Sequence, residues 1–148
     1  MRRGVLAGLG LAMVITGAAS GGGRPPLVAG AYTYELNGGR SHVDLVAFAG
    51  VHGARGTLSF QGTFVDMGGS VTCVTVRGSD AWVAGVIEWG DDVGLDGWMV
   101  RVTDHGARDR AVTFIEDFGL ATAWCEGAST AYDADYLQPV VAGWLIVR

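Results

Sequence analysis

The stretch DAWVAGVIEWGDDVGLDGWMVRVTD, residues 80–104, carries the clearest evidence of the fold class. It contains two runs, 80–89 and 97–104, in which apolar residues recur at every second position, the period of a half-buried β-strand. The residues between the runs are rich in Gly and Asp, which favour turns. The stretch therefore predicts an antiparallel hairpin joined through residues 90–96.

Alternation also predicts which residues of this hairpin share a face. In the second run, the inward residues are Trp98, Val100 and Val102, and the outward residues are Met99, Arg101 and Thr103. In the first run, the residues on one side are Ala81, Val83, Ile87 and Trp89, with Gly85 interrupting the row. A glycine inside a strand is typical of a bulge or of a close neighbour.

Similar signals recur along the rest of the chain. Short runs with strand character are separated by Gly or Asp at fairly regular intervals, a spacing typical of β-sandwiches and β-barrels. These further strands are predicted at residues 30–36, 41–48, 54–61, 64–66, 71–77, 110–115 and 143–147. Residues 118–142 have no clear period and are expected to form a long connection, with a helical turn as one alternative within it. We predict an all-β fold, an antiparallel sandwich or small barrel of about eight short strands, with no long helix in the mature chain.

The composition predicts one folded domain. The length of 148 residues suits a single domain, and the apolar content of 49% excludes a disordered chain. The formal net charge is -5. Since nucleic-acid binding depends on clustered basic residues that neutralise phosphates, we expect no nucleic-acid partner.

The first 19 residues have the order of a secretory signal peptide. Arg2 and Arg3 precede an apolar run at 5–15, which small residues follow at 16–20. The apolar run is too short for a transmembrane helix, which needs about 20 residues, so no membrane span is expected after cleavage. We predict a signal peptide at 1–19, a Gly- and Pro-rich linker at 20–27 and a single β-domain at 28–148. The expected location is secreted or cell-envelope.

Export changes the interpretation of the two cysteines. Outside the cytoplasm thiols tend to be oxidised in pairs, so Cys73 and Cys125 are predicted to form one disulfide that ties the long connection to the sheet. Two free buried thiols are the alternative. Metal binding by these cysteines is not indicated, because the sequence has no Cys-x-x-Cys motif and no His at a ligand spacing from either of them.

Acidic loop residues are the candidate metal ligands. Asp91, Asp92 and Asp96 lie in one predicted hairpin loop, and carboxylates of this kind bind calcium. Their spacing does not match an EF-hand loop, and acids in Gly-rich turns are usually solvated. A solvated acidic rim is therefore the favoured interpretation, with bound calcium as the alternative. No other cofactor is expected.

The aromatic residues of the long connection allow two interpretations. Trp124, Tyr132 and Tyr136 would suit a platform for a sugar or a protein, or a cover over one open end of the β-core, which we favour. No catalytic residue is predicted. The Gly-x-Ser-x-Gly motif is absent, and His105, beside Asp104, would not face it within a strand.

Several spaced motifs resemble a known family. The motifs are Gly56-x-Leu58-x-Phe60, Val71-x-Cys73-x-x-Val76-x-Gly78-x-x-Ala81-x-Val83-x-Gly85-x-Ile87, Val100-x-Val102-x-Asp104-x-Gly106 and Gly143-x-Leu145-x-Val147. Over residues 51–148 this pattern resembles a family of small secreted all-β domains of unknown function, found mostly in exported, uncharacterised proteins of high-GC bacteria. The resemblance implies an exported bacterial β-domain and no particular activity.

These observations lead to an expected function. We expect a secreted, non-catalytic β-domain that acts as a binding or structural module for an extracellular or envelope partner of unknown identity. One alternative is a small-ligand carrier barrel, which would need an apolar interior cavity. The other is a secreted hydrolase, which would need a nucleophile beside a base or two facing carboxylates.

Overall fold

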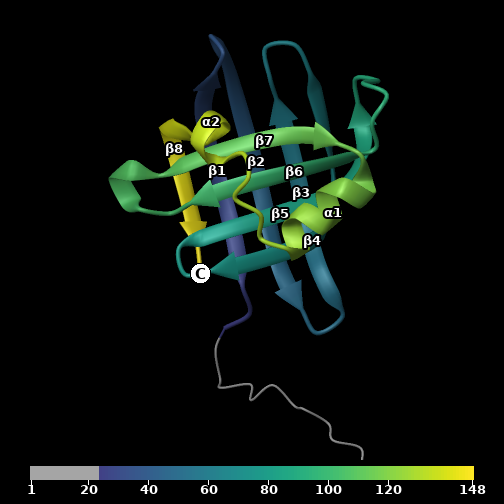
Figure 1. Cartoon of the computed structure of the whole chain (residues 1–148), viewed down its shortest axis with the longest axis vertical. Helices are drawn as coiled ribbons and strands as arrows, with labels where there is room; N and C mark the ends of the chain where they lie inside the picture. The colour runs from purple at the N-terminus through teal and green to yellow at the C-terminus, as the bar shows by residue number, and fades with distance from the viewer. Residues whose placement is uncertain (1–23) are drawn as a thin grey trace, which may run out of the picture.

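The computed structural model describes residues 24–148, which form a closed barrel (Figure 1). Within them, eight antiparallel strands follow one another around the barrel in sequence order, and the first pairs with the last. The strands are β1 Leu27–Leu36, β2 Gly39–Gly50, β3 Gly53–Gln61, β4 Asp66–Arg77, β5 Asp80–Gly90, β6 Gly97–Thr103, β7 Arg110–Glu116 and β8 Gln138–Val147. The prediction of an antiparallel all-β fold is confirmed, and the architecture is a barrel.

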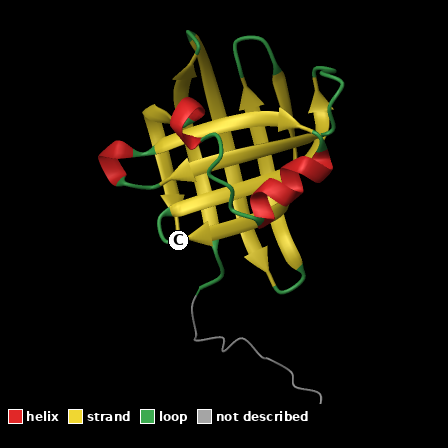
Figure 2. Ribbon diagram, viewed as in Figure 1, coloured by secondary structure: helices red, strands yellow, loops and turns green. Residues whose placement is uncertain are grey.

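The helices are short and lie outside the barrel (Figure 2). They are the 3-10 helix η1 Gly106–Arg108, and the α-helices α1 Phe118–Glu126 and α2 Asp133–Tyr136. The longest spans nine residues, which confirms the expectation that the described domain needs no long helix. In the described chain, no helix is both long and apolar enough to cross a membrane. The predicted signal peptide, 1–19, and the first half of the linker lie outside the described residues.

Alternate residues of the strands fill the barrel with side chains. The buried interior includes Val28, Tyr32, Tyr34, Val43, Leu45, Leu58, Phe60, Met67, Val83, Trp98, Val100 and Val102. The indole Nε1 of Trp98 donates a hydrogen bond to the Val86 carbonyl at 3.0 Å, so the polar edge of the buried ring is satisfied. Since these side chains pack against one another, the inside of the barrel is the hydrophobic core.

The predicted connection at 118–142 proves to be more regular than its sequence pattern suggested. It contains α1, α2 and the first half of β8. Helix α1 begins after Asp117, whose side chain accepts hydrogen bonds from the backbone N–H groups of Gly119 and Leu120 and so caps the helix. Its buried residues Ala121, Trp124 and Cys125 recur at helical spacing. The expectation of a connection with at most a helical turn was therefore wrong in extent, because this short helical period is hidden among small residues.

Two strand predictions also need correction. Of the run 64–66 only Asp66 is in a strand, where it begins β4 together with the run 71–77, and Phe64 lies in an exposed loop. In β5, Gly68 pairs with Trp89 and Gly69 with Ile87, so Glu88 forms a bulge. Because an extra residue inverts the alternation beyond it, Trp89 faces outward rather than lying on the side of Ile87.

The barrel closes at a short seam between β7 and β8. These strands pair only at Arg110 with Pro139 and at Ala111 with Gln138. Farther along β7, the backbone N–H of Thr113 donates a hydrogen bond of 2.9 Å to the hydroxyl of Tyr34 on β1. The tyrosine thus replaces a missing bond of the sheet, and burial raises its pKa above the ordinary value of 10.0.

Candidate functional site

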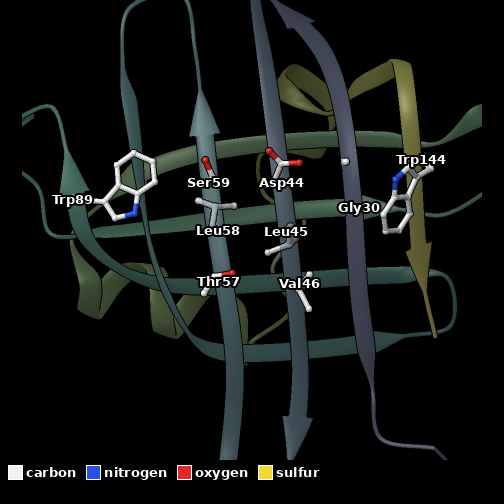
Figure 3. A pocket seen from close by; sticks show the side chains of 10 residues that line it. Gly30, Asp44, Leu45, Val46, Thr57, Leu58, Ser59, Trp89 and Trp144 are labelled. Atoms are coloured by element: carbon white, nitrogen blue, oxygen red, sulfur yellow. The ribbon is translucent and has the colours of Figure 1, made fainter.

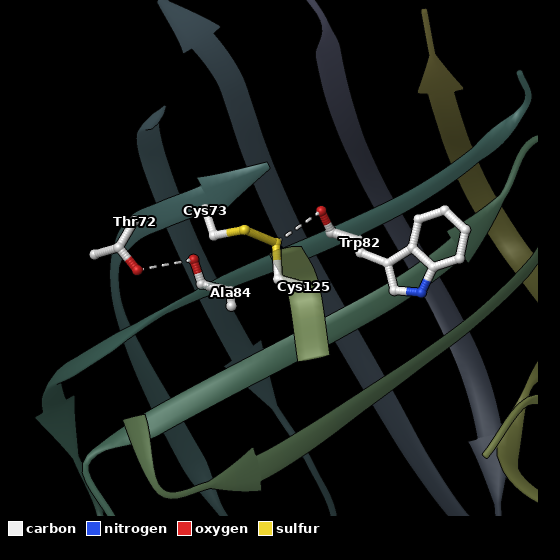
Figure 4. The surroundings of a disulfide bond; sticks show 5 residues. All are labelled: Thr72, Cys73, Trp82, Ala84 and Cys125. Atoms are coloured by element: carbon white, nitrogen blue, oxygen red, sulfur yellow. Dashed lines mark hydrogen bonds between the residues drawn. A yellow bond between two sulfur atoms is a disulfide. The ribbon is translucent and has the colours of Figure 1, made fainter. Parts of the chain in front are cut away.

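One side of the barrel's outer surface is covered by the chain itself. We define the covering segment as residues 118–137, which lies over the outer faces of β4 to β7. Helix α1 contacts β4, β5 and β6, and the disulfide between Cys73 and Cys125 links it to β4 across a Cα–Cα distance of 6.3 Å (Figure 4). Sγ of Cys125 also lies 3.4 Å from the carbonyl oxygen of Trp82 on β5. The predicted disulfide and its role in tying this segment to the sheet are confirmed.

Polar contacts hold the second half of the covering segment. The indole Nε1 of Trp82 donates a hydrogen bond to the Ser129 carbonyl at 2.8 Å. The Arg101 guanidinium stacks 4.0 Å from the Trp82 ring centroid, and its Nη2 donates to Oδ2 of Asp133 at 3.0 Å. Met99 and Arg101 face outward as predicted, yet both are buried, because this segment lies over them.

The aromatic residues of the covering segment act mainly as a cover. Trp124 is buried among the residues beneath α1. The rings of Tyr132 and Tyr136 pack against Phe114 of β7, with centroids 5.5 and 5.3 Å from the Phe114 ring. The favoured covering interpretation holds for Trp124, but the position was wrong, because the segment covers the outer side of the barrel rather than an open end. Tyr132 and Tyr136 remain 46% and 36% exposed, so the platform interpretation stays a prediction for these two rings.

The opposite side of the outer surface is open. We call it the open wall, formed by the outward residues of β8, β1, β2 and β3 and by the adjoining parts of β4 and β5. Within residues 24–148, no helix makes extensive contact with β1, β2, β3 or β8. Large apolar side chains are exposed there, namely Val46, Phe48, Trp89, Trp144 and Ile146. Such a concentration of exposed apolar side chains on one surface is typical of an interaction site.

A single cross-strand row on the open wall joins two tryptophans. Following the strand register from β8 to β5, its members are Trp144, Ala31, Asp44, Ser59, Gly68 and Trp89. Every residue between the tryptophans is small or short, so the row forms a hollow with an indole at each end. We call this hollow the trough; its volume is about 390 Å³.

A glycine seats the Trp89 indole, and another lets β8 approach β1 closely next to Trp144. The Trp89 ring lies over Gly68, where an added Cβ would come within 2.2 Å of the ring. Beside Trp144, Gly143 has a φ of +95°, and an added Cβ would lie 2.0 Å from the Ala31 carbonyl oxygen. Figure 3 shows the two rings at opposite ends of the trough, with Asp44 and Ser59 between them. The rings are about half exposed, at 49% for Trp89 and 51% for Trp144, so each keeps a free face.

Hydrogen-bonding groups lie between the two rings. The carboxylate of Asp44 is exposed and lies 3.4 Å from Nε2 of His42, whose Nδ1 is 3.1 Å from the Thr33 hydroxyl. The hydroxyls of Ser59 and Thr57 line the same hollow. The trough therefore offers apolar ring faces at its ends and polar groups in its middle.

The rows on either side of the trough differ in polarity. One neighbouring row is polar and contains Thr33, His42 and Gln61. The other is more apolar and contains Ile146, Ala29, Val46 and Thr57. A ligand in the trough would therefore meet a polar rim along one edge and an apolar rim along the other.

The side chains of the candidate calcium ligands accept hydrogen bonds from backbone N–H groups. Asp91 Oδ2 accepts from Asp66 N at 2.9 Å, Asp92 Oδ1 from Gly94 N at 3.0 Å, and Asp96 Oδ1 from Phe118 N at 2.8 Å. Asp92 and Asp96 share a shallow surface hollow, which Asp91 does not line. Over residues 24–148, no group of three or more His, Cys, Asp or Glu side chains is arranged to hold a metal ion. Bound calcium stays the alternative interpretation of this loop, and it is untested.

The acidic residues near His105 also accept hydrogen bonds from backbone N–H groups. Asp104 Oδ2 accepts a hydrogen bond from the N–H of Val147 at 3.0 Å, and Asp109 Oδ1 accepts one from the N–H of His105 at 2.7 Å. These carboxylates join the loop after β6 to the end of β8 and close the loop on itself. Their contacts explain the acidic residues of this loop as structural.

Sequence reasoning did not identify the trough, although part of its signal was present. Alternation in the predicted strands 41–48 and 143–147 puts Asp44 and Trp144 on the outward face. The signal for Trp89 was misleading, because the bulge at Glu88 reverses its side. That six strands align these residues in one row follows only from the register.

Comparisons of the chain with protein-family models, with curated proteins and with solved structures found no match.

Proposed function

We propose that the protein is a secreted, non-catalytic binding module and that the trough on its open wall is the binding surface. The observation that carries this proposal is the pair of half-exposed indoles, Trp89 and Trp144, at the two ends of one cross-strand row. The Trp89 ring lies over Gly68, and neither ring belongs to the buried clusters of the described chain. Large apolar rings held in this way on a surface favour contact with a ligand.

The contents of the barrel favour a surface site over an interior one. A carrier barrel would need room inside for its ligand. Here Trp98, Tyr32 and Tyr34 fill the interior together with aliphatic side chains. We therefore assign binding to the outer wall.

The trough also favours binding over hydrolysis. Glycoside hydrolysis generally needs two carboxyl groups that face each other across the scissile bond. Among the residues that line the trough, the one carboxylate is that of Asp44. The adjoining His42 and Thr33 are hydrogen-bonding groups on the same open surface.

Two features support the extracellular or cell-envelope location in this proposal. One is the signal-peptide pattern of residues 1–19. The other is the disulfide between Cys73 and Cys125, a bond that persists in oxidising surroundings. The natural ligand of such a module is a component of a cell surface or of the extracellular medium.

Cosedimentation with surface material tests the proposal. The purified protein is mixed with insoluble cell-surface material from the source organism, and the bound fraction is measured for wild type, Trp89→Ala and Trp144→Ala. Phe64→Ala is the matched control, because Phe64 is a 90% exposed aromatic residue in a loop that does not line the trough. We expect both tryptophan variants to bind less and the control to bind like wild type. Equal binding by all four proteins, or no binding by wild type, would refute the proposal.

A further inference from the structure

Resting on the proposed function, we propose that the ligand of the trough is an extended polysaccharide strand without acidic groups. The strand lies across the β-strands from Trp89 to Trp144, with sugar rings stacked on both indoles. Its hydroxyl groups bond to Asp44 and Ser59 between them. Three features of the row support this ligand, namely its length, its polarity and its charge.

The length of the row favours a polymer. The row crosses six strands, and neighbouring strands are about 4.8 Å apart, so the backbones of its two end strands are about 24 Å apart along the curved wall. The Trp89 ring lies over Gly68 of the neighbouring strand, which shortens the path between the two indoles to about 19 Å. A single sugar cannot touch both indoles over that path. A linear chain of several sugars can do so while it follows the trough.

The polarity of the row matches a sugar chain. A sugar ring has a C–H face that stacks on an aromatic ring and a rim of hydroxyl groups that form hydrogen bonds. The trough supplies both kinds of partner in order, with an indole at each end and the Asp44 carboxylate and Ser59 hydroxyl between them. Because Ala31 carries only a methyl group and the Trp89 ring lies flat over Gly68, which has no side chain, the floor between the two indoles stays low enough for a chain to lie on it.

A protein partner fits this row less well. The centres of protein interfaces are depleted of charged residues, since an unpaired carboxylate is costly to remove from water. Here the Asp44 carboxylate stands in the middle of the row, with its side chain 57% exposed. Sugar hydroxyls can donate hydrogen bonds directly to such a carboxylate, which offsets its loss of water.

The charge around the trough excludes acidic polysaccharides from the proposal. Asp44 lies at its centre, and Glu88 is hydrogen-bonded to Ser70, which stands one row away. The net charge of the whole chain is -5. An acidic polymer would be repelled by these charges, so the sugars are neutral or cationic.

Treatment of the bound surface material identifies the class of the ligand even while the sugar itself is unidentified. One sample is digested with protease, and another is treated with anhydrous hydrogen fluoride, which cleaves glycosidic bonds and leaves peptide bonds intact. We expect wild-type protein to keep its binding after protease and to lose it after hydrogen fluoride. Loss after protease with retention after hydrogen fluoride would overturn the polysaccharide assignment and leave the binding module in place. If wild-type protein does not bind untreated material, the proposed function itself is refuted.

Soluble competitors then test length and charge. Cellohexaose, N-acetylchitohexaose and mannohexaose are compared with their monosaccharides and with oligogalacturonate as inhibitors of surface binding. At least one neutral hexasaccharide should inhibit far better than its monosaccharide, and oligogalacturonate should not inhibit. Trp89→Ala and Trp144→Ala should each lower the affinity for that hexasaccharide about tenfold, equivalent to about 1.4 kcal/mol of binding free energy. Phe64→Ala should leave this affinity unchanged. Inhibition by oligogalacturonate alone, or by monosaccharide as well as by hexasaccharide, would refute the proposed ligand.

Discussion

Trp82 and Trp89 lie on the same strand, β5, and both face outward, yet their surroundings differ. Trp82 is 3% exposed beneath the covering segment, where it bonds to Ser129 and stacks on Arg101. Trp89 is 49% exposed on the open wall, beside Gly68. An outward position in a barrel is thus not equivalent to a surface position. What lies over the strand decides whether the residue stabilises the fold or remains free to bind.

The two sides of the outer surface therefore have different roles, one in stability and the other in binding. The covered wall, which is the outer surface beneath residues 118–137, combines a disulfide, a buried guanidinium and a second apolar cluster around Trp82 and Trp124. The open wall keeps comparable apolar side chains in contact with water. If this division is correct, substitutions should lower stability strongly on the covered wall and weakly on the open wall.

Removing the disulfide should have the largest effect on stability. Closing a loop of 52 residues stabilises a fold by roughly 4 kcal/mol in the chain-entropy model. We expect the double variant Cys73→Ser with Cys125→Ser to lose up to about this free energy of unfolding, measured by denaturant titration. Limited proteolysis should then cut within residues 118–137 before it cuts the barrel. Cleavage that begins in the strands of the open wall would contradict the assigned role of the bond.

Breaking the ion pair under the covering segment should have the next largest effect. Asp133→Ala leaves the guanidinium of Arg101, whose side chain is 5% exposed, with Asp80 as its remaining carboxylate at 3.5 Å. Because Asp133 itself is partly exposed, we expect a loss of about 2 kcal/mol, less than for a fully buried pair. The matched control is Asp135→Ala, an exposed acid in the same helix. Equal stability of the two variants would show that this ion pair does not hold the segment.

A smaller loss is expected at the seam where the two walls meet. Tyr34→Phe removes the hydroxyl that accepts from Thr113 N and leaves this N–H group without its partner, at a cost of about 1.5 kcal/mol. Hydrogen exchange should become faster at the Thr113 amide and remain unchanged in β3. An unchanged rate at Thr113 would mean that the tyrosine does not close the seam.

The buried tyrosines at this seam should make the stability of the fold sensitive to alkaline pH. Burial raises the folded-state pKa of Tyr34, and of Tyr32 beside it, above the ordinary value of 10.0. The fold therefore favours the neutral phenols, and their contribution to stability is complete below about pH 10 and is lost as the pH rises through the folded-state values. The free energy of unfolding should fall above pH 10, and less steeply in Tyr34→Phe. An identical slope in both proteins would exclude Tyr34 as a cause.

The smallest effect is expected on the open wall. Trp144→Ala removes a half-exposed ring from outside the core, so the free energy of unfolding should fall by less than about 1 kcal/mol. Thermal unfolding of this variant should stay close to that of wild type, while its binding to surface material is reduced. A loss of more than about 2 kcal/mol would place Trp144 among the structural residues and weaken its assignment to binding.

Much of the fold was predictable because strand periodicity is a local property. Strict alternation placed Trp98, Val100 and Val102 inside and Met99 and Arg101 outside, as the structure has them. The two cysteines and the signal-peptide pattern allowed the disulfide to be predicted as well. Helix α1 was missed because its nine residues offer only a short apolar period, and Trp89 was misplaced because a bulge interrupts β5.

The sequence by itself determined the alternation of the strands, the covalent link between Cys73 and Cys125 and the outward side of Asp44 and Trp144. Only the tertiary structure decided that Trp144, Asp44, Ser59 and Trp89 fall in one row, because strand register depends on pairing around the whole barrel. It also decided which outward residues are buried. Burial of an outward side chain depends on a segment that lies elsewhere in the chain, so local periodicity cannot report it.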